Sequence, residues 1–82
     1  MEYISDTYGN KRTYLDGKFH SYDDNPSIIT IGGDKYWYKD GNLHRDNDLP
    51  AIIQIDGHAE WWINGKKIKE CDNYFIKVKR AN

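Results

Sequence analysis

Residues 36–53 read Tyr-Trp-Tyr-Lys-Asp-Gly-Asn-Leu-His-Arg-Asp-Asn-Asp-Leu-Pro-Ala-Ile-Ile, and the rest of the chain repeats this stretch. Residues 12–29, which begin 24 positions earlier, read Arg-Thr-Tyr-Leu-Asp-Gly-Lys-Phe-His-Ser-Tyr-Asp-Asp-Asn-Pro-Ser-Ile-Ile. Residues 60–65, which begin 24 positions later, read Glu-Trp-Trp-Ile-Asn-Gly. A fixed period without insertions indicates an array of stacked units. The sequence predicts one repeat domain of about 3.4 copies over its 82 residues, divided as 1–11, 12–35, 36–59 and a degraded copy at 60–82.

Each copy contains two dipeptides that end in glycine, and these predict tight hairpin turns. They are Tyr8-Gly9, Asp16-Gly17, Gly32-Gly33, Asp40-Gly41, Asp56-Gly57 and Asn64-Gly65. Such pairs suit type I′ turns, in which both central residues have positive φ. The segments between them are rich in Ile, Trp, Tyr and Thr, which favours short strands near 3–7, 11–15, 18–20, 27–31, 35–39, 42–44, 51–55, 59–63, 66–69 and 74–79. We therefore expect an all-β fold, a meandering antiparallel sheet of stacked β-hairpins.

Two-residue turns at every hairpin would place Ile28 opposite Trp37, and Trp37 opposite His44. One face of the sheet would then be a ladder of Ile, Trp and His that forms the main core. The other face would carry Ile29, Ile31, Tyr36, Tyr38, Leu43, Ile53, Ile55 and Trp62. A sheet that is apolar on both faces must cover the second face or lend it to a partner.

The sequence contains no constellation that predicts catalysis. His44 and Arg45 could hold a phosphate, but a half-buried histidine that bonds to a link backbone explains the pair equally well. The acidic clusters at 23–25 and 46–48 lack the glycine and glutamate of a calcium-binding loop, so we expect no metal site there. Cys71 has no partner motif. We expect no enzyme activity and no cofactor.

Composition suggests a soluble protein of a reducing, cytoplasmic compartment, because the chain has one cysteine and lacks a long apolar run. The net charge is −1, but residues 1–63 are acidic and residues 64–82 are basic. Aromatic rings could stack on single-stranded nucleic acid. The rings lie mainly in the acidic part, however, whereas a nucleic-acid footprint places rings and positive charge together.

Residues 36–45, Pro50-Ala51 and residues 60–66 resemble the MORN-type repeat, in a variant with a Trp-Tyr-x-x-Gly-x-x-His-Arg and Pro-Ala pattern. Copy 36–59 matches this pattern fully. The first full copy has Ser21 and Ser27 in place of the arginine and the alanine, and the last copy lacks His, Arg and Pro. The variant is associated with phage and large-virus proteins. The resemblance implies a meandering antiparallel sheet with a binding or scaffolding role.

Our first hypothesis is a non-catalytic binding protein that uses its aromatic sheet face on a host protein, which it inhibits, or on its own copy. The expected binding residues are Tyr36, Tyr38, Leu43, His44, Arg45 and Trp62. The alternative is a small homo-oligomer that sequesters a nucleotide or another anionic ligand, with His44, Arg45 and a tryptophan in the pocket. Binding of single-stranded nucleic acid is a third possibility, and no membrane association is expected.

Overall fold

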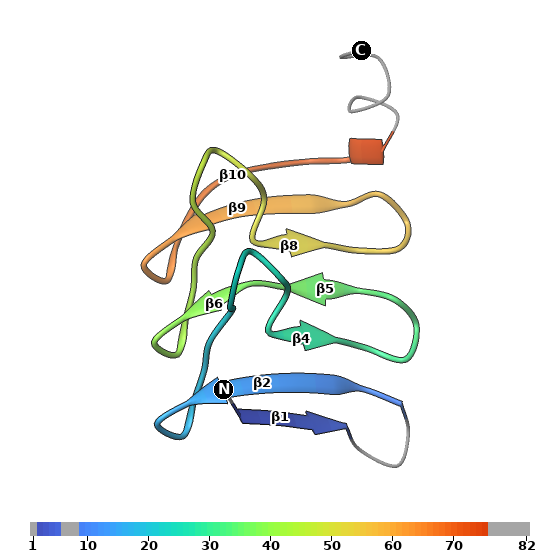
Figure 1. Ribbon diagram of the computed structural model, residues 1–82. Helices are drawn as coiled ribbons and strands as arrows, with labels where there is room; N and C mark the ends of the chain where they lie inside the picture. Colours follow the sequence, from blue (N-terminus) through green and yellow to red (C-terminus); the bar gives the residue numbers. More distant parts are fainter. Residues whose placement is uncertain (1, 6–8, 76–82) are drawn as a thin grey trace.

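The computed structural model describes residues 2–5 and 9–75, with side chains from residue 9 onward. It confirms a nearly all-β, meandering antiparallel sheet (Figure 1). The strands are β1 Glu2–Ser5, β2 Lys11–Leu15, β3 Lys18–Phe19, β4 Ile28–Ile29, β5 Lys35–Tyr36, β6 Tyr38–Lys39, β7 Asn42–Leu43, β8 Ile52–Ile53, β9 Ala59–Ile63 and β10 Lys66–Cys71. They follow the order β1-β2-β4-β5-β8-β9-β10, while β3 pairs with β2, and β6 pairs with β7.

Some rows of the sheet are one strand, such as β2 and β9. Others consist of two short strands, such as β3 and β4, separated by a polar segment that leaves the sheet. Both β3 and β4 pair with β2, and the chain leaves the sheet between them. We call residues 21–26 the first link and residues 45–50, between β7 and β8, the second link. Backbone bonds from Gly41 to Phe19 O (2.9 Å) and from Gly65 to Leu43 O (2.8 Å) join the β6-β7 pair to its neighbours. The described strands therefore form one continuous surface.

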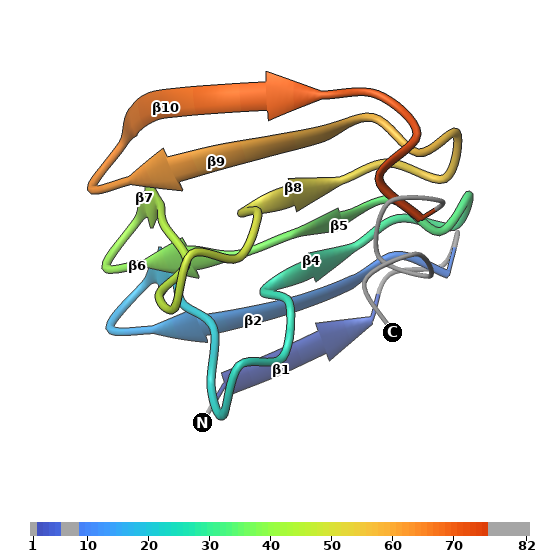
Figure 2. The ribbon, with the colours of Figure 1, turned by 90° about the horizontal axis from the view of Figure 1, so that it is seen from above.

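Both links leave the sheet on the same side (Figure 2). Within them, consecutive residues have left-handed backbone angles: Asp23 and Asp24 at φ 53° and 59°, Asn47 and Asp48 at φ 66° and 56°. Asp and Asn adopt this conformation more readily than other residues with a side chain. The acidic clusters of the sequence thus serve as the tight bends of the links.

The same hydrogen bonds recur 24 residues apart in the structure. Thr13 N–H donates to Ser27 O at 2.8 Å, and Trp37 N–H donates to Ala51 O at 2.7 Å. Further examples include the bonds from Ser21 to Tyr38 O and Arg45 to Trp62 O, and those from Asp40 N to His20 Nδ1 and Asn64 N to His44 Nδ1. Successive copies therefore share backbone geometry as well as residue types.

The second turn of each hairpin unit has the predicted form. Asp16, Asp40 and Asn64 have φ between 50° and 52°, and each is followed by a glycine with positive φ. The pairs Leu15↔Lys18, Lys39↔Asn42 and Ile63↔Lys66 close the three turns directly. Trp37 lies opposite His44, as expected, because His44 N–H donates to Trp37 O at 3.0 Å.

The turns at Gly32-Gly33 and Asp56-Gly57 are one residue longer than predicted, and the turn predicted at Tyr8-Gly9 lies partly outside the described residues. Gly33 N–H donates to Thr30 O (2.9 Å) and Thr30 N–H donates to Asp34 O (3.0 Å), so the loop spans residues 31–33. Gly33 has φ 100°, the left-handed residue that ends a three-residue hairpin loop. The turn at 55–57 repeats this arrangement, with Gly57 bonded to Gln54 O.

The longer turns shift the register by one residue and correct the predicted ladder. Ile28 pairs with Tyr36, and Ile52 pairs with both Tyr36 and Glu60, so neither isoleucine faces a tryptophan. A one-residue shift moves side chains to the opposite face of a strand. Ile31 and Ile55 lie in the turns, with 74% and 69% of their surface exposed, and do not belong to either sheet face.

Each face of the sheet therefore keeps its predicted aromatic residues but differs from the prediction in its isoleucines. The link face, on the side of the links, carries Thr13, His20, Ser27, Trp37, His44, Ala51, Ala59 and Trp61. The open face carries Arg12, Tyr14, Phe19, Ile28, Tyr36, Tyr38, Leu43, Ile52, Glu60, Trp62, Lys67 and Glu70. Most of the buried residues (Ser27, Trp37, His44, Ala51 and Ala59) lie on the link face, and Pro50 of the second link is buried with them. The core thus lies between the link face and the links.

The last hairpin departs from the regular pattern. The pairing shifts between Lys67 and Lys69, so Trp61 lies opposite Lys69 and the bulged Ile68 is 57% exposed. A bulge of this kind re-aims the residues that follow it. The strand predicted near 74–79 is not formed at Tyr74 and Phe75, and its remainder lies outside the described residues, as do residues 6 and 7 of the strand predicted near 3–7.

Candidate functional site

His44 is used within the fold. Its side chain is 9% exposed, and its Nδ1 accepts a 3.0 Å hydrogen bond from Asn64 N–H in the turn of the next hairpin. Because Nδ1 is an acceptor, the ring proton resides on Nε2, which donates to Asp46 Oδ1 at 2.8 Å. Both ring nitrogens are thereby occupied, and His44 ties one copy to the next.

Arg45 closes a clamp over Trp37. Its Nε and Nη2 donate to the two carboxylate oxygens of Asp24 at 2.9 and 3.1 Å, and its Nη1 donates to Pro50 O at 3.1 Å. The guanidinium carbon lies 3.8 Å from the centre of the Trp37 ring. Trp37 Nε1–H donates to Asp24 O at 3.0 Å. Hydrogen bonding and charge attraction from Arg45 hold the pKa of Asp24 below its ordinary value of 3.8, although burial opposes them.

A hollow of about 270 Å³ lies beside this clamp, on the side of the links. Its lining residues are His20, Ser21, Asp23, Asp24, Trp37, Tyr38, Lys39, His44, Arg45, Asp46 and Asn47. The arginine in it is already paired with Asp24, and the carboxylates of Asp23 and Asp46 outnumber the one further cation, Lys39. Like charges repel, so the hollow disfavours an anionic ligand.

The open face carries a connected row of aromatic rings. The Tyr14 and Phe19 ring centres are 4.9 Å apart and the rings are stacked, and the Phe19 and Tyr38 centres are 5.1 Å apart. Tyr38 pairs with Leu43 in the adjacent strand. All of these side chains are partly exposed. Burial and the neighbouring Tyr36 raise the pKa of Tyr38, so its phenol stays protonated and neutral at physiological pH.

The structure divides the six predicted binding residues between the two faces. Tyr36, Tyr38, Leu43 and Trp62 share the open face. His44 lies on the link face, and Arg45 begins the second link with its side chain over Trp37. The first four form one surface with Ile28 and Ile52, in place of the predicted Ile29 and Ile53.

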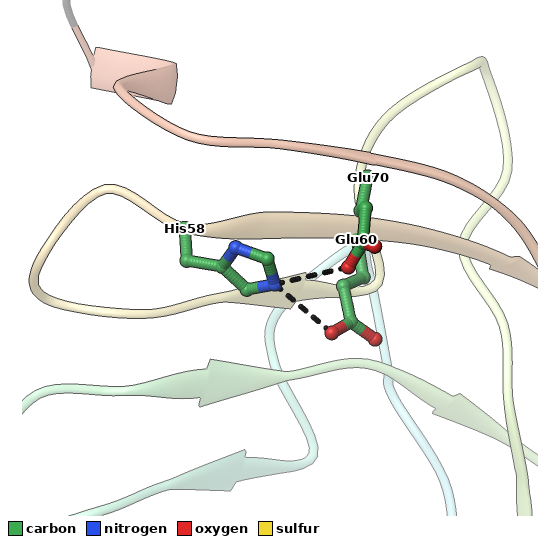
Figure 3. Close-up of side chains that lie close together, drawn as sticks. All are labelled: His58, Glu60 and Glu70. Carbon is green, nitrogen blue, oxygen red and sulfur yellow. Dashed lines mark hydrogen bonds and ion pairs between the residues drawn. The ribbon is translucent and has the colours of Figure 1, made fainter.

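A further cluster on the open face, around His58, was missed by the sequence analysis (Figure 3). His58 Nε2 lies 3.0 Å from Glu60 Oε2 and 3.4 Å from Glu70 Oε2, and Nδ1 lies 2.8 Å from Asp72 Oδ1. The two glutamates are direct cross-strand partners. The spacing His58-x-Glu60 placed two of the groups on one face of a strand, but only the bulge brings Glu70 opposite them.

Proton affinities in this cluster are coupled. The carboxylates of Asp72 and Glu60, which accept hydrogen bonds from the ring, raise the pKa of His58 above 6.5 despite some desolvation. Partial burial raises the pKa of Glu60, but hydrogen bonds from Trp62 and His58 outweigh it and leave that pKa below 4.5. These contacts favour the protonated form of His58 beside the two opposed glutamates.

No protein-family model, curated protein or solved structure matches this chain. Among the described residues, there is no helix with the length and hydropathy needed to cross a membrane.

Proposed function

We propose that this chain is a non-catalytic protein-binding domain that contacts its partner through the open face. The observation that carries the proposal is the row of partly exposed rings from Tyr14 through Phe19 to Tyr38, extended by Leu43 and Trp62. The links cover the opposite side of the sheet, so these rings keep part of their surface in solvent. Aromatic side chains that expose apolar area on a rigid sheet are typical anchors of protein interfaces.

The border of the open face defines the partner's chemistry. Acidic residues outnumber basic ones at this face. Asp16, Asp40 and Asp56 lie in turns at the strand ends and Asp34 follows a turn, and Glu60 and Glu70 lie on the last strands, against Arg12 and Lys67 on the face itself. Complementarity favours a protein whose apolar patch is bordered by basic side chains. The resemblance of residues 36–45 to repeats of phage and large-virus proteins supports a host protein, held inactive by the bound chain, as that partner.

Lysine placement argues against nucleic acid as the ligand. Most lysines of the paired strands alternate with the rings, so Lys35 and Lys39 lie on the face opposite Tyr36 and Tyr38. Lys67, opposite Trp62, is the exception among the described lysines, and it is bonded to Glu70. Lys11, Lys18, Lys66 and Lys69 share that opposite face. A single strand could not stack on the rings and contact this lysine set together. Sequestration of a nucleotide, the alternative, is disfavoured by the carboxylates around Arg45.

Site-specific crosslinking tests the proposal. A photo-crosslinking amino acid at Tyr38 should trap one defined protein in host cells, and the same group at Lys39 is the matched control on the opposite face. The trapped protein is then purified, and its affinity is measured for the wild type, for Tyr38→Ser with Trp62→Ser, and for Lys35→Ser with Lys39→Ser. We expect at least a tenfold loss only in the first double variant, with circular dichroism showing that both variants fold.

Equal crosslinking from the two positions, or unchanged affinity in a folded Tyr38/Trp62 variant, would remove the open face as the binding surface. Crosslinks between two copies of this chain, together with a dimer in light scattering that Trp62→Ser dissociates, would overturn the host partner in favour of self-association.

A further inference from the structure

From the geometry of the last hairpin, we propose that His58, Glu60 and Glu70 bind a divalent first-row transition-metal ion, with Zn²⁺ as the reference ion. The ligand atoms, His58 Nε2 and one oxygen of each glutamate, all lie within 4.8 Å of one another. An ion with Zn–N and Zn–O bonds of about 2.0–2.2 Å in tetrahedral geometry separates its ligand atoms by about 3.3–3.5 Å. The observed separations from Nε2 are 3.4 Å to Glu70, within that range, and 3.0 Å to Glu60, slightly below it, so binding requires small side-chain movements and loss of any proton on Nε2.

Backbone pairing brings two carboxylates together at this position, beside His58 and Lys67. Glu60 and Glu70 are directly opposed on β9 and β10, and like charges in that arrangement destabilise a sheet. The bulge between Lys67 and Lys69 produces the opposition, because an unshifted ladder would place Lys69 opposite Glu60. A divalent ion between the two carboxylates removes the repulsion and joins the strands.

Outer contacts already orient two of the three ligands. Asp72 lies 2.8 Å from His58 Nδ1, which fixes that nitrogen as a donor and leaves Nε2 for a metal. Trp62 Nε1–H donates to Glu60 Oε1 at 2.8 Å, so Oε2 of the same carboxylate is directed toward His58. A carboxylate behind a histidine is the usual outer shell of a metal-bound imidazole.

One contact opposes metal binding. Lys67 Nζ lies 3.1 Å from Glu70 Oε2, the oxygen assigned to the metal, so the ammonium must give up this carboxylate when the ion binds. The corresponding positions of the preceding copy, Asp34, Tyr36 and Asp46, lack a histidine and a second glutamate. The site is therefore specific to the last hairpin. Three protein ligands leave the fourth coordination position of the ion for water. The site lies on the open face with Trp62, but all three of its ligands come from this chain, so ion binding does not require the protein partner.

Calorimetric titration of the whole chain with ZnCl₂, at mildly alkaline pH, tests the site. We expect one ion per chain, at least a tenfold weaker affinity in each of His58→Gln, Glu60→Gln and Glu70→Gln, and about a tenfold weaker affinity in Asp72→Asn. Lys67→Ala should bind severalfold more tightly. Asp48→Asn, at an exposed carboxylate that contacts only Lys69 among the residues described, is the matched control and should leave affinity unchanged.

Cysteine is the main competing ligand, so Cys71→Ser is the second control. Cys71 pairs with Ala59 and lies on the link face, away from the three ligands. The absorption spectrum of the Co²⁺-loaded wild-type chain should show tetrahedral d–d bands without a thiolate charge-transfer band. Absence of saturable Zn²⁺ binding, loss of binding in Cys71→Ser, or unchanged affinity in folded Glu60→Gln and Glu70→Gln would overturn the assignment.

Discussion

Trp37 and Trp61 occupy equivalent positions of successive copies, yet they are held with different strength. Each indole N–H donates to the carbonyl of a link residue, Asp24 at 3.0 Å and Asp48 at 2.9 Å. Over Trp37 the cation is Arg45, 3.8 Å from the ring centre and bonded to both oxygens of Asp24. The same backbone arrangement therefore holds both indoles. We call the set around Trp37 the tight clamp and the set around Trp61 the loose clamp.

Over Trp61 the cation is Lys69. Its ammonium lies 4.7 Å from the ring centre and 3.6 Å from a single oxygen of Asp48. The Lys69 side chain is 53% exposed, whereas that of Arg45 is 12% exposed. A planar guanidinium stacks on a ring and bonds both carboxylate oxygens together, which an ammonium cannot do. The difference between the two clamps therefore comes from the cation and its burial.

Substitution of the two tryptophans should give the largest difference in stability between the two clamps. Trp37 is 4% exposed, so Trp37→Ala should lower the free energy of unfolding by about 3–5 kcal/mol, the usual cost of emptying a buried aromatic site. Trp61 is only partly buried, and Trp61→Ala should cost about 1–2 kcal/mol. Urea unfolding followed by circular dichroism measures both values. Equal losses would mean that the two clamps contribute equally.

Exchange of the cations tests the source of the difference. Arg45→Lys removes one of two bonds to Asp24, the bond to Pro50 O and the stacking on Trp37, and should cost about 1–2 kcal/mol. Lys69→Arg should stabilise the chain by less than about 1 kcal/mol, because that pair is exposed to solvent. Melting temperatures of the two single variants provide the measurement. A loss in both directions would indicate that backbone differences, not cation chemistry, separate the clamps.

Acid should weaken the tight clamp by protonating Asp24. The expected loss of stability is smaller than that from the tryptophan substitutions or from Arg45→Lys. The pKa of Asp24 is depressed in the folded chain, so its contribution is present above the ordinary value of 3.8 and is lost as pH falls through the folded pKa. Asn tolerates the left-handed backbone of Asp24, which makes Asp24→Asn a matched substitution. Because this carboxylate is 52% exposed, the variant should lose about 1 kcal/mol or less at neutral pH.

The expected signature is a stability difference between wild type and Asp24→Asn that is constant near neutrality and shrinks below pH 3.8. Urea unfolding across the acid range provides it. The corresponding Asp48→Asn variant, at the loose clamp, is the control and should show a smaller difference throughout. A gap for Asp24→Asn that persists to the lowest pH would assign its effect to something other than the Arg45 pair.

The sequence predicted the fold well because repetition and glycine-containing turns are local signals. Asp40-Gly41 and Asn64-Gly65 behave as expected, since Asp and Asn accept positive φ next to glycine. The predicted length of the loop at Gly32-Gly33 was wrong by one residue, because a pair of glycines permits both two-residue and three-residue loops. That single residue exchanged the faces of Ile28 and Ile29 and changed the predicted core.

The candidate sites were harder to predict because they depend on contacts between copies. His44 and Arg45 are adjacent in sequence, but their partners lie 20 and 21 residues away at Asn64 and Asp24. The His58 cluster depends on the bulge after Lys67, and no residue type in 66–71 predicts a bulge there. Open-face residues such as Tyr38 and Trp62 were found, because alternation along a strand is a local property.

The recurrence of link contacts bears on how such a chain changes length. Asp24 relates to Trp37 and Arg45 as Asp48 relates to Trp61 and Lys69. Excision of residues 36–59 would place Trp61 under the Asp24 carbonyl and Lys69 beside the Asp24 carboxylate. The shorter chain would then contain one complete clamp and no incomplete one. Duplication of the same segment would add one complete clamp. Genes that encode such chains can therefore gain or lose whole copies through unequal recombination and still specify a protein with every indole bonded.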